Sequence, residues 1–140
     1  MTTPAPFDKI ALLNQTFSGL DDEELRDLAS LTELHTYPPD CVLCHEGAYE
    51  EVFYIIASGQ AETTKKISDN EGQRLLRMAG PGDYFGEMAL IQKAPRAATV
   101  RTVSDCTVLE MGKADFEAML SRSPRMALSI IRSTLDRMRS

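Results

Sequence analysis

Short strand-like runs alternate with turn residues through the middle of the sequence, and this pattern limits the fold more than any other feature. The run Val52–Ala57 is continuously apolar and ends at Ser58–Gly59, which is typical of a buried strand. Ser68–Gly72 is rich in turn residues and predicts a hairpin loop. Many short strands between residues 40 and 111 predict a barrel or sandwich.

Helical patterns lie on both sides of this block. We expect helices within residues 7–36, with Asp21 as the N-cap and Glu24 completing a capping box. We also expect helices within residues 113–139. Ser123-Pro124 has the form of an N-cap followed by the first helical residue, where proline is tolerated. The chain is therefore predicted to be α+β and mainly β.

The segment from Gly82 to Val100 carries the strongest chemical signal. Gly82 and Gly86 allow the backbone to turn tightly and to approach another group closely. Residues 87–91 are helix formers, enough for about one turn, and the free N–H groups at a helix start attract an anion. Arg96 follows a proline, and its planar guanidinium matches a phosphate. The segment predicts a phosphate site.

Glu87 lies at the start of this short helix and cannot bind the anion. Its carboxylate is suited to accept a hydrogen bond, and a sugar hydroxyl is the obvious donor. The segment therefore predicts a ligand with one phosphate and a ribose. In the alternative interpretations, Arg96 is a solvated loop residue, and Glu87 favours the helix dipole or pairs with Arg96 when no ligand is bound.

The run Phe85-Gly86-Glu87-Met88-Ala89-Leu90, followed by Pro95-Arg96-Ala97-Ala98-Thr99-Val100, resembles the phosphate-binding cassette of cyclic nucleotide-binding domains. The resemblance implies an antiparallel β-roll with flanking helices and a short cassette helix. It implies that the helix and its glycine hold the cyclic phosphate, the arginine pairs with it, and the glutamate takes the ribose 2′-hydroxyl. The ligand-binding residues that we expect are Phe85, Gly86, Glu87, Met88, Ala89, Arg96, Ala97, Ala98 and Arg137.

Three positions refine this resemblance. Ala97 lacks the hydroxyl that guanine-preferring members often carry as threonine, so we expect cAMP to bind better than cGMP. Arg137, on the last helix, is a candidate to stack on the purine, with Leu135 and Met138 as apolar alternatives. Alternatively, Arg137 only favours the helix dipole. Asp40 replaces the usual family glycine, and either another turn conformer or a left-handed aspartate would accommodate it.

Length and composition indicate the number of domains, the classes of partner and the cellular compartment. The 140 residues suit one domain, which we place at 7–140 after a flexible N-terminus at 1–6. The formal net charge of −6 argues against direct nucleic-acid binding. No apolar run is long enough to span a membrane, and nothing at the start has the form of a secretory signal. Three cysteines fit a reducing cytoplasm better than a disulfide framework.

The function predicted from these features is regulatory and not enzymatic. Nucleotide binding would move the C-terminal helices and act on an effector domain or partner, and a homodimer is possible. One alternative is an interaction module that ignores nucleotide. Another is a haem or redox sensor, supported only by Cys41-Val42-Leu43-Cys44-His45, although cysteines three apart on a strand would face opposite ways. No metal site and no catalytic constellation is predicted.

Overall fold

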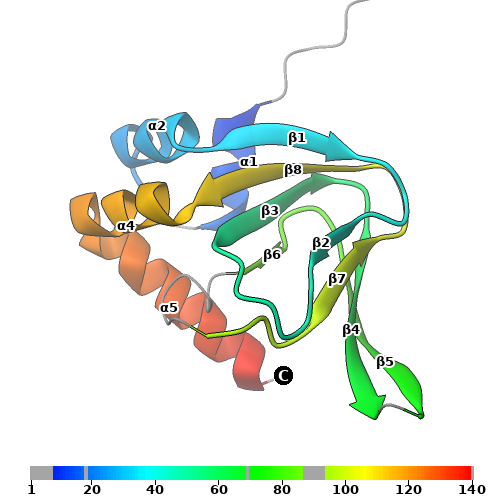
Figure 1. The fold of residues 1–140 in the computed structure, drawn as a ribbon. Coiled ribbons are helices and arrows are strands. Elements are labelled where there is room, and N and C mark those ends of the chain that lie inside the picture. Colours follow the sequence, from blue (N-terminus) through cyan, green and yellow to red (C-terminus); the bar gives the residue numbers. More distant parts are fainter. Residues whose placement is uncertain (1–7, 18, 69, 87–93, 140) are drawn as a thin grey trace, which may run out of the picture.

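A computed structural model describes residues 8–17, 19–68, 70–86 and 94–139 (Figure 1). The helices are α1 (Lys9–Thr16), α2 (Asp22–Ser30), α4 (Lys113–Arg122) and α5 (Pro124–Arg139). The strands are β1 (Glu33–Tyr37), β2 (Val42–Cys44), β3 (Val52–Ser58), β4 (Ala61–Ser68), β5 (Gly72–Ala79), β6 (Tyr84–Phe85), β7 (Thr99–Thr102) and β8 (Cys106–Gly112). In the part of the chain that the structure describes, no helix is both long and apolar enough to cross a membrane.

The strands form two four-stranded antiparallel sheets, in the orders β1-β8-β3-β6 and β2-β7-β4-β5. Figure 1 shows the helices gathered at one side and the β4–β5 hairpin projecting from the other. The predicted antiparallel β-roll with flanking helices is confirmed. The predicted cassette helix at residues 87–91 lies outside the described residues, as does the predicted flexible segment 1–6.

The prediction of helix through residue 36 is wrong. Helix α2 ends at Ser30, and β1 begins at Glu33 and pairs with β8 from Glu33↔Glu110 to Tyr37↔Cys106. Strand β1 lies at the edge of its sheet, and four of its five residues are exposed. An edge strand of this kind lacks the apolar alternation by which a strand is recognised in sequence. Pairing with a strand about 70 residues away decides its conformation.

The predicted helix starts are confirmed. The Asp21 side chain accepts a hydrogen bond from the Glu24 N–H at 2.8 Å, and the Glu24 side chain accepts one from the Asp21 N–H. At the start of α5 the Ser123 hydroxyl accepts from the Met126 N–H at 3.2 Å. Asp40 has φ of 65°, so of the two alternatives for this position the left-handed aspartate is the one present.

Two separate cores follow from the alternation of side chains along β3. Phe53 and Ile55 face the helices, whereas Tyr54 and Ile56 face the interior of the roll. We call the first the helix-side core, whose largest buried members include Phe17, Phe53, Phe116, Leu13, Leu28, Met126 and Ile130. We call the second the roll core, formed by Leu43, Cys44, Tyr54, Ile56, Ala61, Ala79, Val100, Cys106 and Val108.

The first turn of α5 is tied to the N-terminal helices. The Ser123 hydroxyl donates to a Glu24 carboxylate oxygen. Arg125 Nη2 donates to the Gly19 carbonyl at 2.5 Å, and Nη1 donates to Glu24 Oε1 at 3.5 Å. Beyond Ile130 the described side chains of α5 are exposed, including Ile131 and Leu135. Helix α5 is therefore anchored at its start.

Candidate functional site

Arg96 lies on the segment that enters β7, and its backbone is fixed against the loop between β2 and β3. The Arg96 N–H donates to the Ala48 carbonyl at 2.8 Å, and the Gly47 N–H donates to the Arg96 carbonyl at 2.8 Å. These paired bonds turn the side chain inward, so that only 6% of the residue is exposed. Arg96 is therefore not a solvated loop arginine.

The guanidinium of Arg96 contacts the start of the cassette segment. Nη1 donates to the Gly86 carbonyl at 3.0 Å, and Nη2 donates to the Val52 carbonyl at 2.5 Å. Nε lies 3.6 Å from Glu50 Oε1, is buried, and makes no hydrogen bond with any described residue. A buried donor without a partner is costly, so this edge of the guanidinium is suited to receive an anionic ligand.

Gly86 is the position at which the backbone must lack a side chain. Its φ is 96°, and an added Cβ would lie 2.5 Å from the Val52 carbonyl oxygen and 2.7 Å from Arg96 Nη1. The backbone at Gly86 therefore lies close to the side chain of Arg96, as the glycine led us to expect for an unspecified group. Any larger residue would displace the guanidinium from its present position.

An aromatic pair stands beside Gly86. Phe85, on β6, stacks on Tyr54 of β3 with ring centroids 5.0 Å apart and an interplanar angle of 24°. Burial, together with the nearby Cys44 and Glu110, raises the pKa of the Tyr54 phenol well above its usual range. Tyr54 is therefore neutral and extends the apolar wall of the roll core toward the cassette.

The structure brings together Phe85, Gly86 and Arg96 of the expected ligand-binding residues. Ala97 lies in an exposed bend and Ala98 is half-buried just before β7. The backbone of Arg137 belongs to α5, and its side chain is outside the described part, as are Glu87, Met88 and Ala89. The ligand-binding role of each of these residues stays a prediction.

Three residues around Arg96 were not expected at the site from the sequence: Val52 and Glu50, which contact or face it, and His45, which contacts Glu50. Val52 takes part through its carbonyl, which no side-chain pattern could reveal. Glu50 Oε1 accepts from the His45 N–H at 2.8 Å, and Oε2 lies 2.9 Å from His45 Nδ1. The signal available in the sequence was an acidic residue shortly before an apolar strand, which is too common to be informative.

The cysteine motif lies apart from this site. Cys44 is buried in the roll core and Cys41 packs against the same core, so the expectation that they face opposite ways is wrong. A shift in the β2–β7 register between Val42 and Cys44 accounts for the shared face. Cys41, Cys44 and Cys106 form no disulfide. Among the described residues, no group of three or more His, Cys, Asp or Glu side chains could hold a metal ion.

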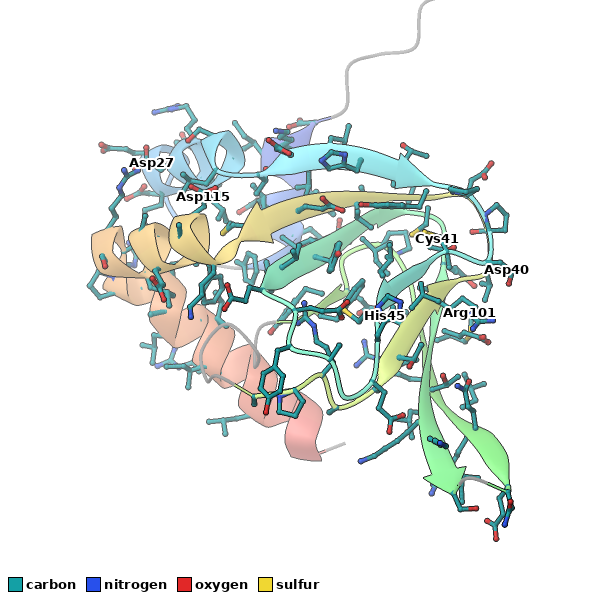
Figure 2. All side chains as sticks on the ribbon, viewed as in Figure 1. Asp27, Asp40, Cys41, His45, Arg101 and Asp115 are labelled. Atoms are coloured by element: carbon teal, nitrogen blue, oxygen red, sulfur yellow. The ribbon has the colours of Figure 1, made fainter. Side chains whose placement is uncertain are left out.

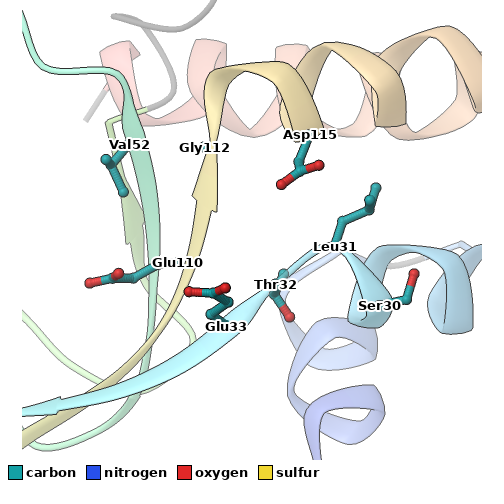
Figure 3. Close-up of a pocket in the computed structure, with 8 residues that line it drawn as sticks. All are labelled: Ser30, Leu31, Thr32, Glu33, Val52, Glu110, Gly112 and Asp115. Carbon is teal, nitrogen blue, oxygen red and sulfur yellow. The ribbon is translucent and has the colours of Figure 1, made fainter.

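A cavity of about 290 Å³ lies elsewhere, between the end of α2, strands β1 and β8, and the start of α4. Figure 3 shows the carboxylates of Glu33, Glu110 and Asp115 around it. Glu110 is also the acceptor for the Tyr37 hydroxyl. Three carboxylates repel an anion, so of these two places only the surroundings of Arg96 suit a phosphate.

Comparison with known proteins places the chain in a family. The model of the cyclic nucleotide-binding domain family matches residues 34–123, which include the whole segment from Gly82 to Val100. The chain belongs to the cyclic nucleotide-binding domain family. This family is a class of regulatory domains, as the resemblance of the cassette segment implied.

Individual relatives give the same class. A cAMP-dependent protein kinase regulatory subunit from Pyricularia oryzae is 36% identical over 103 residues, which are 74% of this chain and 25% of that protein. The regulatory domain of Toxoplasma gondii PKA, solved with cAMP, has a TM-score of 0.75 and 31% identity, covering 91% of this chain and 47% of that one. The Thermus thermophilus catabolite activator protein has a TM-score of 0.81 and 28% identity, covering 89% and 58% respectively.

Proposed function

We propose that this chain is a regulatory domain that binds cAMP in preference to cGMP. The buried guanidinium of Arg96 carries the proposal, because it donates to the carbonyl of Gly86 in the cassette segment and its Nε–H lacks a hydrogen-bond partner among the described residues. The names of the relatives support the same ligand: one is a cAMP-dependent kinase subunit, and one was solved with cAMP.

In this proposal the cyclic phosphate binds between Arg96 and the N–H groups that follow Gly86. Glu87 accepts the ribose 2′-hydroxyl, and Ala97 leaves a guanine base without the hydroxyl that would favour it. Arg137, on α5, stacks on the purine. Met88, Ala89, Ala98 and Phe85 complete the lining of the site. The base and the phosphate would then engage different elements, and this couples binding to the position of α5.

The output would lie outside this chain. The chain spans about a quarter of the kinase regulatory subunit and 58% of the bacterial activator. We therefore propose that binding acts on a further domain or a separate effector protein, in the cytoplasm and without catalysis by this domain. The identity of that effector does not follow from the fold.

Calorimetric titration of nucleotide-free protein with cAMP and cGMP tests the proposal. We expect cAMP to bind more tightly, and Arg96→Ala to weaken it by roughly ten- to a hundredfold or more, because a charge-assisted hydrogen bond is lost. Arg101→Ala, on β7, is the matched control because it removes the same charge a few residues away. Unchanged affinity in Arg96→Ala would reject the site, and no binding of either nucleotide would favour an interaction module.

A second titration tests Glu87. A ligand without the 2′-hydroxyl should lose most of its affinity for the wild-type protein, because the carboxylate then has no partner. On the Glu87→Ala variant, the ligand without the 2′-hydroxyl should bind almost as tightly as cAMP. Equal losses on both proteins would show that Glu87 does not contact the ribose.

A further inference from the structure

Glu50 is shared between a histidine and the arginine of the site. Its side chain is 27% exposed and lies just before β3. Oε1 accepts from the His45 N–H at 2.8 Å and faces Arg96 Nε at 3.6 Å, whereas Oε2 lies 2.9 Å from His45 Nδ1. Figure 2 shows His45 at the end of β2, on the side of the roll away from Asp27 and Asp115. One carboxylate thus serves both an imidazole and a guanidinium.

Glu50 is ionised at neutral pH. Burial alone would raise the pKa of its carboxyl, but the two hydrogen bonds with His45 and the charges of His45 and Arg96 outweigh burial and hold the pKa below its usual value. Among the described residues it is the only acidic partner of Arg96, because the neighbouring Glu51 pairs instead with Lys113 at 3.6 Å. The buried guanidinium therefore has Glu50 as its counter-ion.

The Glu50 carboxylate beside Arg96 affects how an anionic ligand can bind there. A phosphate that pairs with Arg96 must lie near the carboxylate that already faces Nε, and two negative charges at one guanidinium repel each other. A proton on His45 would place a positive charge 2.9 Å from Glu50 and reduce that repulsion. The imidazole is the side chain whose charge changes between about pH 5 and 8. A cyclic phosphodiester keeps one negative charge throughout this range.

We propose that Glu50 is an internal competitor for Arg96 and that His45 makes nucleotide binding proton-linked, with tighter binding at acidic than at alkaline pH. This inference rests on the proposed function. Among the described residues, Tyr54 is a further titratable group that interacts with Arg96. Tyr54, from β3, stays neutral, and Arg96 itself does not titrate in this range. His45 is therefore the imidazole that pairs with Glu50, with Nδ1 2.9 Å from Oε2.

The test is calorimetric titration of the whole chain with cAMP at about pH 6 and about pH 8. We expect the wild type to bind cAMP about two- to fivefold more tightly at the lower pH, because an interaction between partly exposed charges contributes a free energy of this size. His45→Gln should abolish the difference. His35→Gln is the matched control, because His35 lies on β1 and pairs with Glu33 and Glu110, so it should retain the difference.

A second variant tests the competitor directly. Glu50→Gln keeps an acceptor for the His45 N–H but removes the charge, so cAMP should bind about fivefold more tightly at about pH 8 and show little pH dependence. Its melting temperature without ligand should fall, because the buried guanidinium loses its counter-ion, and cAMP should restore much of it. Unchanged or weaker binding would overturn the role of Glu50.

Reciprocal linkage supplies a further readout. If His45 protonation favours the nucleotide, the nucleotide must favour the proton, so binding near neutral pH takes up protons. Titrations in two buffers that differ in ionisation enthalpy measure this uptake, and His45→Gln should remove it. Wild-type binding that is independent of pH and takes up no protons would overturn this inference alone. Absence of cAMP binding at both pH values would remove the proposed function and this inference with it.

Discussion

The helix-side core and the interior of the roll are stabilised in different ways. The helix-side core consists of apolar side chains, with Phe53 in contact with Phe17, Tyr84 and Phe116. The buried polar side chains beside the roll core include a charged one, Arg96, together with Thr102, whereas those beside the helix-side core are the hydroxyls of Thr32 and Ser123. Thr102 Oγ1 accepts from the Cys41 N–H at 2.8 Å and donates to the Pro38 carbonyl at 2.6 Å.

The two regions should therefore contribute differently to the stability of the fold and to ligand binding. Apolar contacts are non-directional, so the helix-side core needs the right volume more than specific partners. Buried polar groups need partners at defined positions, and such groups can also recognise a polar ligand. Mutations on the two sides should therefore differ in what they change: stability on the helix side, and both stability and binding in the roll.

The largest expected effect is on the helix side. Phe116→Ala should lower the free energy of unfolding by about 3–5 kcal/mol, because Phe116 is fully buried and its ring centroid lies 5.6 Å from that of Phe53. Urea denaturation followed by circular dichroism measures the change. Tyr49→Ala, at a residue that is 68% exposed, is the control and should cost little. A loss below about 1 kcal/mol would contradict a closely packed core.

Thr102→Val tests the roll. The substitution keeps the shape of the side chain but leaves the Cys41 N–H and the Pro38 carbonyl without their partner, so we expect a loss of about 1–3 kcal/mol. The same change at the exposed Thr36 should cost less than about 0.5 kcal/mol. Equal values for the two variants would show that hydrogen bonding does not distinguish the roll from the surface.

The capping box of α2 should contribute less. Asp21→Ala removes the acceptor for the Glu24 N–H and should cost about 1 kcal/mol. Thermal unfolding measures this loss, and Asp22→Ala, one residue into the helix, is the control. If both variants lost the same amount, the effect would come from the charge near the helix dipole and not from the cap.

The smallest expected effect is the pH dependence of stability through Glu50. Its lowered pKa means that the folded state holds the ionised form better than the unfolded state does. The stabilisation is therefore present above the unfolded value near 4.5 and is lost as the pH falls through the folded pKa. The stability difference between wild type and Glu50→Gln should shrink below that pH. A difference that stays constant down to pH values well below 4.5 would contradict this assignment.

Local chemistry made part of this structure predictable. The strand at Val52–Ala57 and the cap at Asp21 follow from short patterns, and both are present. Gly86 and Arg96 were singled out from spacing, and the structure places them in contact. Strand β1 was missed because it is defined by pairing with β8 and carries no pattern of its own.

Glu50 and His45 were missed for a related reason. Their importance arises from the packing of two loops, since the Arg96 side chain reaches residues 44 positions earlier in the chain, such as Val52. A sequence shows which side chains are present but not which carbonyl or carboxylate a folded arginine will meet. The glycine and the arginine could therefore be singled out from the sequence, whereas the carbonyl and the carboxylate around the guanidinium could not.

Helix α5 is attached at its first turn, so a rotation about that end produces a larger displacement at its other end. Ser123 and Arg125 fix one end near Glu24 and Gly19, and Figure 1 shows the helix running from there toward the side of the roll where β7 lies. With 16 residues it is about 24 Å long. A rotation of roughly 10° about the anchored end moves the far end by about 4 Å. A small rotation at the first turn of α5 is thus amplified along the exposed part of the helix that follows Ile130.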